Sequence, residues 1–167
     1  MDQLWPRHIN DSLQLLKFVR GSDLRVVDLG SGGGFPAIPL AIASRGTERR
    51  FTLVEPIAKK AAFLRAVGRE LHLPITVEAK RAEQLDSRET FDLVTARALA
   101  PLPELLDYAH PLLSSGGRAL LLKGRNYRRE LDSAAASFHF DVYVHPSESD
   151  AEGVVLEITS LRAKSAA

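Results

Sequence analysis

The chain has 167 residues, of which 45% are hydrophobic and 26% charged, a composition typical of one globular domain with its own hydrophobic core. Its 22 basic and 21 acidic side chains leave a net charge of +1, which does not by itself indicate a nucleic-acid binder. The absence of cysteine excludes disulfides, thiolate nucleophiles and thiolate zinc ligands. We expect a monomeric, cytoplasmic domain over residues 1–167, with no signal peptide, membrane span or metal.

The first predicted elements run from the N-terminus to a glycine-rich turn. A helix is predicted over residues 2–20, in which Asp11 and Gln14 have the spacing of a capping box. An apolar, β-branched run predicts a buried strand over residues 24–29. Four glycines in five positions follow, and then an apolar run that predicts a helix over residues 38–43. A strand, a glycine turn and a helix in this order are typical of the nucleotide-binding start of a doubly wound sheet.

The glycine spacing bears on the kind of nucleotide. A dinucleotide-binding turn has the pattern Gly-x-Gly-x-x-Gly, but Phe35 occupies the position of the third glycine. The pattern Asp28-x-Gly30-x-Gly32-x-Gly34 instead resembles motif I of S-adenosylmethionine-dependent methyltransferases, whose cofactor has no pyrophosphate. The residues of this turn that we assign to cofactor binding are Asp28, Gly30, Ser31, Gly32, Gly34 and Phe35.

Strands and helices alternate through the rest of the chain. Four further strands are predicted, over residues 51–55, 75–79, 91–95 and 118–123. Three helices are predicted, over residues 58–73, 103–113 and 128–137. A terminal hairpin is predicted over residues 140–145 and 154–161, and the tail from residue 162 is expected to fray. This order predicts an α/β fold of the Rossmann-like methyltransferase type, a mostly parallel seven-stranded sheet with one antiparallel strand in the hairpin.

Several side chains follow the predicted strands at their carboxyl ends, the edge where doubly wound sheets bind ligands. Glu55 ends the second strand about 20 residues beyond the first glycines, where a carboxylate accepts hydrogen bonds from ribose hydroxyls. Ala82 and Glu83 follow the third strand, where an adenine would lie. Arg97 and Lys123 follow the next two strands and are expected over the crevice.

Short motifs in the same order also characterise one known family. The most specific are Gly34-Phe35-Pro36-x-Ile38-Pro39-Leu40, Lys59-Lys60-x-x-Phe63-Leu64 and Thr95-x-Arg97-Ala98. Others fall within residues 7–13, 81–83 and 122–131. On these motifs the chain resembles the bacterial RsmG (GidB) methyltransferases, which methylate guanine N7 in small-subunit ribosomal RNA.

The resemblance implies a cofactor, a substrate and a set of contacts. The cofactor would be S-adenosyl-L-methionine, and the partner would be ribosomal RNA, the small ribosomal subunit or its precursor. In the family, cofactor contacts fall on the positions that match Gly30, Phe35, Ala82, Glu83 and Arg97. The helical segment that precedes Arg7 and His8 in the family is expected to be absent here.

Methylation of guanine N7 needs no general base, because N7 carries an unprotonated lone pair at neutral pH. Catalysis would then come from alignment of the reacting atoms, and the target base would have to be unpaired or extruded. Arg97 and Lys123 are candidates to position guanine O6 or a phosphate. The alternatives are that Arg97 serves only the cofactor and that Lys123 is a strand end extending into solvent. The residues assigned to RNA binding are Arg7, His8, Lys123, Arg125, Arg128 and Arg129.

Three other functions stay open at this point. The chain could be a small-molecule methyltransferase, which the basic cluster after Lys123 disfavours. It could be a nicotinamide dehydrogenase, which Phe35 disfavours. It could also be a catalytically weak module that binds the cofactor or RNA.

Overall fold

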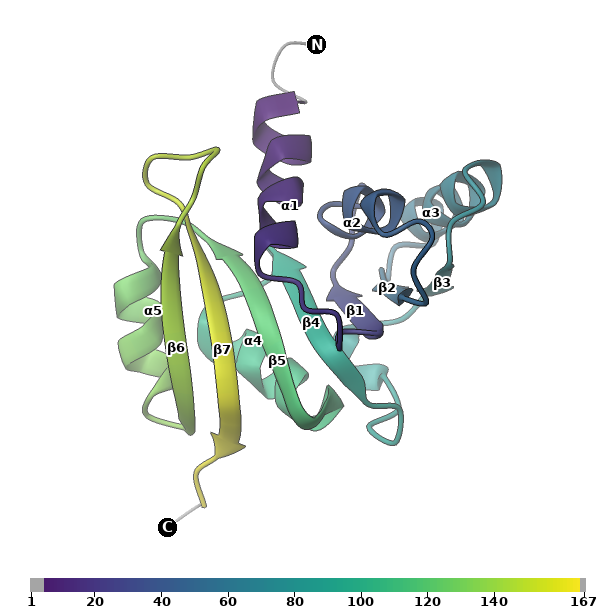
Figure 1. Ribbon diagram of the computed structural model, residues 1–167. Helices are drawn as coiled ribbons and strands as arrows, with labels where there is room; N and C mark the ends of the chain where they lie inside the picture. The colour runs from purple at the N-terminus through teal and green to yellow at the C-terminus, as the bar shows by residue number, and fades with distance from the viewer. Residues whose placement is uncertain (1–4, 166–167) are drawn as a thin grey trace.

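A computed structural model describes the backbone of residues 5–165 and the side chains from residue 8 onward (Figure 1). Seven strands form one sheet in the order β3-β2-β1-β4-β5-β7-β6. Their bounds are β1 (Arg25–Leu29), β2 (Arg50–Val54), β3 (Ile75–Glu78), β4 (Phe91–Arg97), β5 (Leu113–Lys123), β6 (Phe138–Pro146) and β7 (Val154–Ala163). Strands β1 to β5 pair in parallel, and β7 runs antiparallel to both β5 and β6. The predicted fold class is confirmed.

The helices connect the strands and cover the sheet. The first is continuous over η1 (Trp5–Asn10), α1 (Asp11–Leu13) and η2 (Gln14–Lys17), and we call it the N-terminal helix. The others are α2 (Ala37–Ala43), α3 (Ala58–Glu70), α4 (Leu102–Ala109) and α5 (Tyr127–Ala134), with short turns η3 (Ala82–Gln84) and η4 (His110–Leu112). The predicted first helix therefore ends at Lys17 rather than at residue 20, and its predicted residues 2–4 lie outside the described part.

Two hydrophobic layers lie on the two faces of the sheet. On one face, α2, α3 and Leu15 of the N-terminal helix share a cluster with Val26 and Leu93. On the other face, α4 and α5 share a cluster with Val27 and Val94. Successive strand residues alternate between the faces, so parallel strands covered on both sides must be apolar almost throughout. This burial explains the continuous apolar runs in the sequence.

The strand register brings the carboxyl ends of the central strands to one edge of the sheet. Leu29 at the end of β1 lies opposite both Val54 of β2 and Ala96 of β4, and Arg97 lies opposite Leu122 of β5. The loops after β1, β2, β4 and β5 therefore meet at this edge, below the N-terminal helix in Figure 1. A ligand site at this edge can draw on residues far apart in the sequence.

Most strand boundaries lie within two residues of the prediction, and the start of β5 differs by five. Strand β5 begins at Leu113 rather than at residue 118, because residues 114–117 form a large bulge: pairing passes from Phe91–Leu113 to Leu93–Arg118. The expected fraying from residue 162 is wrong for Arg162 and Ala163. Both continue β7 because their backbones pair with β6.

Neither a membrane-spanning helix nor a metal-binding cluster of side chains occurs among the described residues. No helix in this part of the chain is long and apolar enough to span a bilayer. No group of three or more His, Cys, Asp or Glu side chains within it could hold a metal ion.

Candidate cofactor and substrate site

The glycine turn after β1 needs its glycines for both conformation and space. Gly30, Gly32 and Gly34 have φ values of 69°, 55° and 94°, in the left-handed region that favours glycine. A Cβ on Gly30 would lie 2.6 Å from Leu99 Cδ1, and one on Gly34 would lie 2.5 Å from Ile38 Cγ1. The turn is thus packed tightly between the β4–α4 loop and α2.

Glu55 fastens this turn to the start of α3. Its side chain is buried, with Oε2 accepting a hydrogen bond from the Gly32 N–H at 2.9 Å and Oε1 accepting one from the Ile57 N–H at 2.8 Å. A carboxylate oxygen has two acceptor sites, so neither bond prevents Glu55 from accepting a ribose hydroxyl as well. The predicted ribose contact stays a prediction.

Asp28 is a buried carboxylate with one oxygen left unpaired. Its Oδ1 accepts a hydrogen bond from Thr95 Oγ1 at 2.7 Å, whereas Oδ2 has no partner among the described residues. Burial raises the pKa of Asp28 to about 6, against the lowering effects of hydrogen bonds from Ser31 and Thr95 and of the Arg97 charge. A buried acceptor without a partner is costly, so this oxygen suits a hydrogen-bond donor from a ligand.

A cavity of about 220 Å³ opens beside the turn and collects residues from four loops. It is lined by Gly30 after β1, by Val54 and Pro56 around the end of β2, and by Ala82 and Glu83 after β3. Three of the residues assigned to the cofactor thus line one hollow.

Arg97 extends from the end of β4 across the glycine turn. Its guanidinium lies 5.6 Å from the centre of the Phe35 ring, and Nη1 lies 3.5 Å from Asp11 Oδ2 on the N-terminal helix. The other contact of Phe35 is a stack on His8, with ring centres 5.1 Å apart. Arg97 is therefore held between a carboxylate and an aromatic face, and its side chain is 23% exposed.

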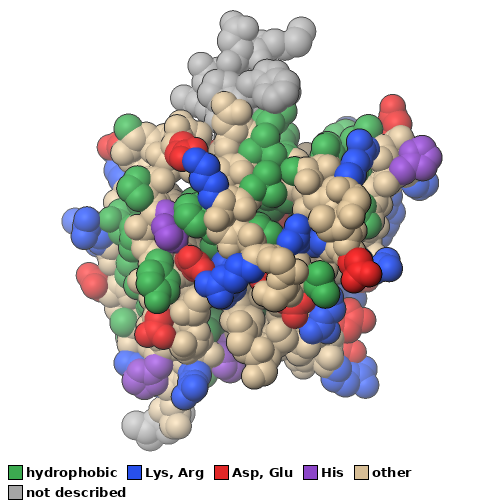
Figure 2. All heavy atoms as spheres, viewed as in Figure 1, with side chains coloured by type: hydrophobic (Ala, Val, Ile, Leu, Met, Phe, Trp, Pro, Cys, Tyr) green, Lys and Arg blue, Asp and Glu red, His purple; other side chains and the backbone are tan. Residues whose placement is uncertain are grey.

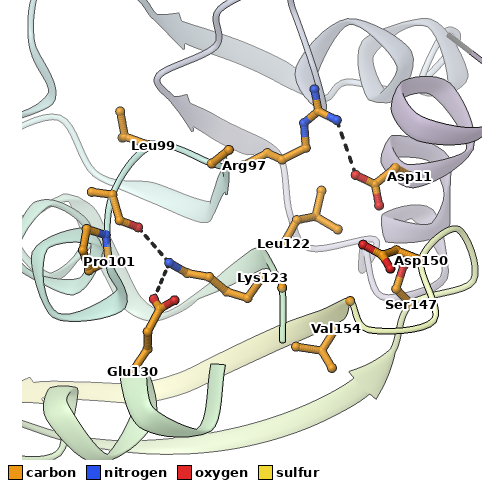
Figure 3. A pocket seen from close by; sticks show the side chains of 14 residues that line it. Asp11, Arg97, Leu99, Pro101, Leu122, Lys123, Glu130, Ser147, Asp150 and Val154 are labelled. Atoms are coloured by element: carbon orange, nitrogen blue, oxygen red, sulfur yellow. Dashed lines mark hydrogen bonds and ion pairs between the residues drawn. The ribbon is translucent and has the colours of Figure 1, made fainter. Parts of the chain in front are cut away.

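A larger cavity, of about 450 Å³, is lined on one side by Arg97 (Figure 3). Its lining includes Lys123, Glu130 of α5 and Asp150 of the β6–β7 loop. Leu99 lines both this cavity and the smaller one, so the two cavities are neighbours. Ala98, immediately before Leu99, has a φ of 51°, in the left-handed region, where the chain turns away from β4.

Lys123 lines the larger cavity but already has partners. Its ammonium donates to the Ala100 carbonyl and to Glu130 Oε2, each at 2.7 Å, and only 8% of its side chain is exposed. Glu130 Oε2 also accepts a bond from the Leu102 N–H at 2.7 Å. Lys123 is therefore not a strand end extending into solvent, because its side chain is buried. Its bonds to Ala100 and Glu130 join the β4–α4 loop to α5.

Comparison with known proteins identifies the family. The model of the GidB family, described as rRNA small subunit methyltransferase G, matches residues 1–153. The chain belongs to this family. Ribosomal RNA small subunit methyltransferase G of Gluconobacter oxydans is 46% identical over 160 residues, covering 96% of this chain and 80% of the relative. The protein of that name from Dinoroseobacter shibae is 42% identical over 159 residues, covering 94% of this chain and 81% of the relative.

Solved structures support the fold independently. A SAM dependent methyltransferase from Aquifex aeolicus superimposes with a TM-score of 0.70 at 12% identity, over 96% of this chain and 93% of the other. The ribosomal protein L11 methylase of Lactobacillus delbrueckii superimposes with a TM-score of 0.70 at 18% identity, over 88% and 75%. The GidB chain thus has the S-adenosylmethionine-dependent methyltransferase fold.

In this GidB chain, the N-terminal helix and the β6–β7 loop are joined in a way that the sequence did not reveal. Gln14 is buried; its Oε1 accepts a bond from the Glu148 N–H at 2.9 Å, and its Nε2 donates to Asp11 Oδ1 at 2.7 Å. Asp11 Oδ1 also accepts a bond from Ser149 Oγ at 2.7 Å. The predicted capping box is wrong, because the helix already begins before Asp11, whose carboxylate is free to bridge Arg97 and Ser149.

Two residues of α4 that line the smaller cavity, Glu104 and Tyr108, were missed in the sequence. Tyr108 of α4 donates to Glu104 Oε1 at 2.5 Å, and this bond, with a minor effect of burial, raises the pKa of Tyr108 to about 12. Arg81 also lines this cavity. Tyr108 lies ten residues beyond Ala98 and outside every motif, so no sequence signal places it at this cavity.

The residues assigned to RNA binding lie in different settings. Arg125, Arg128 and Arg129 are exposed around the start of α5, where Arg125 pairs with Glu152 at 2.8 Å and Arg128 lies 5.2 Å from the Tyr127 ring centre. His8 is half-buried against Phe35, and the side chain of Arg7 lies outside the described part. Figure 2 shows basic and acidic side chains mixed over the visible face, without one large basic area. Their roles in RNA binding stay predictions.

Proposed function

We propose that this chain transfers a methyl group from S-adenosylmethionine to N7 of a guanine in small-subunit (16S) ribosomal RNA. The observation that carries the proposal is the pair of neighbouring cavities, one bounded by the motif I glycine turn and one by Arg97, with Leu99 lining both. Such a pair suits a donor molecule and an acceptor base that must meet end to end. Membership of the GidB family, with its relatives named for ribosomal RNA methylation, supports this choice of substrate.

The residues around the smaller cavity fit S-adenosylmethionine. Ala82 and Glu83 would border its adenine, and Glu55 would accept bonds from its ribose. The unpaired Oδ2 of Asp28 would accept a hydrogen bond from the amino group of the cofactor. This buried oxygen would then have a hydrogen-bond partner. When bound, S-adenosylmethionine supplies an electrophilic methyl on a sulfonium centre.

The larger cavity would hold the target base. Its volume of about 450 Å³ lies within the range of ligand pockets. In A-form RNA the N7 edge faces a deep, narrow groove, so the guanine must be unpaired or extruded to enter. The lone pair of N7 needs no base, and the residues of the chain act by holding the guanine in line with the donor.

Arg97 and Lys123 have different positioning roles in this proposal. Arg97, held by Asp11 and Phe35, would donate to guanine O6 or to a neighbouring phosphate. Lys123 would act through Glu130 and Ala100, keeping the β4–α4 loop and α5 in place around the base. This assignment follows from the two hydrogen bonds that Lys123 already makes.

The test is methyl transfer to defined RNA substrates. The purified chain is incubated with S-adenosylmethionine carrying a deuterated methyl and with small ribosomal subunits or naked 16S ribosomal RNA that lack the modification. After nuclease digestion, mass spectrometry should find the label in 7-methylguanosine. Label at another nucleoside position, or calorimetric binding of the cofactor without any transfer to RNA, would contradict the proposal.

A further inference from the structure

The first half of α3 exposes two lysines around one aromatic ring. Lys59 and Lys60 are exposed, and Phe63 keeps 53% of its surface exposed. They precede Phe63 by four and three positions, so both lie one turn from it on the same side of the helix. The opposite side of α3 packs into the core through Ala61 and Leu64. We call the exposed residues Lys59, Lys60 and Phe63 the α3 surface.

The two lysines differ from the other four lysines of the chain. Lys17, Lys80 and Lys123 form ion pairs, and Lys164 donates to the Ala135 carbonyl. Among the described residues, Lys59 and Lys60 have neither an ion pair nor a hydrogen bond from their side chains. Their charges are therefore available to an external anion.

Helix stability does not account for these lysines. Both lie in the first turn of α3, where the positive end of the helix dipole disfavours cations, and no acidic residue accompanies them there. Arg69 in the last turn of the same helix has the favourable placement. An exposed phenylalanine likewise adds little to folding, because its ring stays in contact with water.

The α3 surface adjoins the site on the side away from α5. The first turn of α3 follows Glu55, which binds both the Gly32 N–H and the Ile57 N–H. Leu64 lies against the glycine turn, 3.2 Å from where a Cβ on Gly34 would be. In the sheet, α3 follows β2 and α5 follows β5, on opposite sides of β1 and β4 (Figure 1). RNA with one base in the larger cavity would thus have one flank near each helix.

We propose that the α3 surface is a contact for single-stranded RNA, with an unpaired base next to the target stacking on Phe63 and adjacent phosphates binding Lys59 and Lys60. The inference rests on the proposed function and adds the path of the strand. Aromatic side chains beside unpaired cations are the means by which proteins hold unpaired nucleotides without reading their sequence.

Anisotropy with a fluorescein-labelled, unstructured 12-nucleotide RNA, one guanine among uridines, tests the cations. Lys59→Glu and Lys60→Glu should each weaken binding at least fivefold and reduce the salt slope by about 0.7. Their melting temperatures should stay equal or rise, because an acid replaces a cation at a helix N-terminus. The matched control Arg69→Glu makes the same charge change at the other end of α3, and it should lower the melting temperature while leaving RNA affinity unchanged.

Substitutions at Phe63 test the stacked base. Phe63→Leu should weaken binding of the same RNA by roughly 5- to 150-fold, the range for losing one stacked base, whereas Phe63→Tyr should keep it. Calorimetric affinity for S-adenosylmethionine should match the wild type in every variant.

The outcomes separate this inference from the proposed function. If the wild type methylates small subunits but the lysine and Phe63→Leu variants bind RNA as the wild type does, the α3 contact is wrong and the function stands. If variants lose methylation of subunits while binding the RNA normally, the surface contacts a ribosomal protein, which overturns the RNA contact. Altered cofactor affinity would also overturn it. Failure of the wild type itself to methylate RNA would instead refute the proposed function.

Discussion

Asp28 carries a charge that its surroundings oppose. Its folded-state pKa is about 6 against an ordinary value of 3.8, so between these pH values the folded protein holds a proton that the unfolded chain has lost. The stability contributed by that proton is present at low pH and is lost as the pH rises through about 6. Near neutral pH the ionised carboxylate is thus a cost of about 3 kcal/mol in the absence of a ligand.

We therefore expect Asp28→Asn to raise the stability of the ligand-free protein at pH 7.5, by roughly 1–2 kcal/mol, because the neutral amide avoids the cost of a buried charge. The same change should weaken S-adenosylmethionine binding at least tenfold. An amide N–H₂ in place of Oδ2 cannot accept the hydrogen bond that the amino group of the cofactor would donate. Denaturant unfolding at several pH values and calorimetry measure the two effects. A variant that is less stable at pH 7.5 and binds the cofactor normally would contradict this role for Asp28.

Arg97 combines three features that lysine cannot reproduce together: a planar group over Phe35, a fork of donors and a pairing with Asp11. Arg97→Lys should lower kcat for RNA methylation by roughly 10²-fold, the scale of a lost positioning contact, with the dissociation constant of S-adenosylmethionine changed less than threefold. Single-turnover kinetics with saturating cofactor give the first value and calorimetry the second. The reverse pattern would mean that Arg97 serves only the cofactor.

At the scale of elements, the N-terminal helix and the β6–β7 loop form one wall of the larger cavity. Gln14 joins them through its bonds to the Glu148 N–H and to Asp11, which in turn binds Ser149. Gln14 is buried and Asp11 and Ser149 are partly buried, so each depends in part on the others for a hydrogen-bond partner.

Gln14→Ala should cost about 1 kcal/mol of stability, since it removes the partly buried hydrogen bond that the Glu148 N–H donates to Gln14. Hydrogen exchange should then quicken across residues 147–153, while exchange in β1 and β4 stays as in the wild type. Exposed Asn10→Ala on the same helix is the matched control and should leave that loop protected. Unchanged exchange in the loop would show that Gln14 does not hold it.

The sequence predicted the sheet well because its signals were local and strong. Apolar runs indicated the buried parallel strands, and glycine spacing indicated the turn whose left-handed residues pack against Leu99 and Ile38. The failures involved partners that are remote in the chain. Arg162 and Ala163 were predicted to belong to a frayed tail, yet their backbones pair with β6. A nearer partner was also missed: Lys123 ends a strand over the crevice as predicted, but the sequence did not indicate its ion pair with Glu130, which α5 brings beside it.

At the scale of the whole molecule, a buried charge network fastens the segment after the N-terminal helix to the sheet. Arg118 of β5 is 1% exposed and pairs with Asp23 at 2.5 Å and with Glu157 of β7 at 3.0 Å. It also donates to the Phe18 carbonyl at 2.5 Å, and Glu157 in turn accepts bonds from Arg20. Parts of the chain about 140 residues apart thus share one set of charges.

Removing one member of this network should cost far more than removing a surface charge. Asp23→Ala removes one of the two carboxylates that pair with the buried Arg118 guanidinium, and it removes the acceptor of the Arg20 N–H. We therefore expect a loss of about 3–5 kcal/mol in the free energy of unfolding. Glu148→Gln breaks the exposed pair with Lys17 and serves as the control, with an expected loss below about 1 kcal/mol. Urea unfolding followed by circular dichroism measures both. Equal losses would mean that the buried network contributes no more than a surface pair. Because the network fixes the segment between the N-terminal helix and β1, Asp23→Ala should also loosen the helix that carries Asp11 and with it the hold on Arg97.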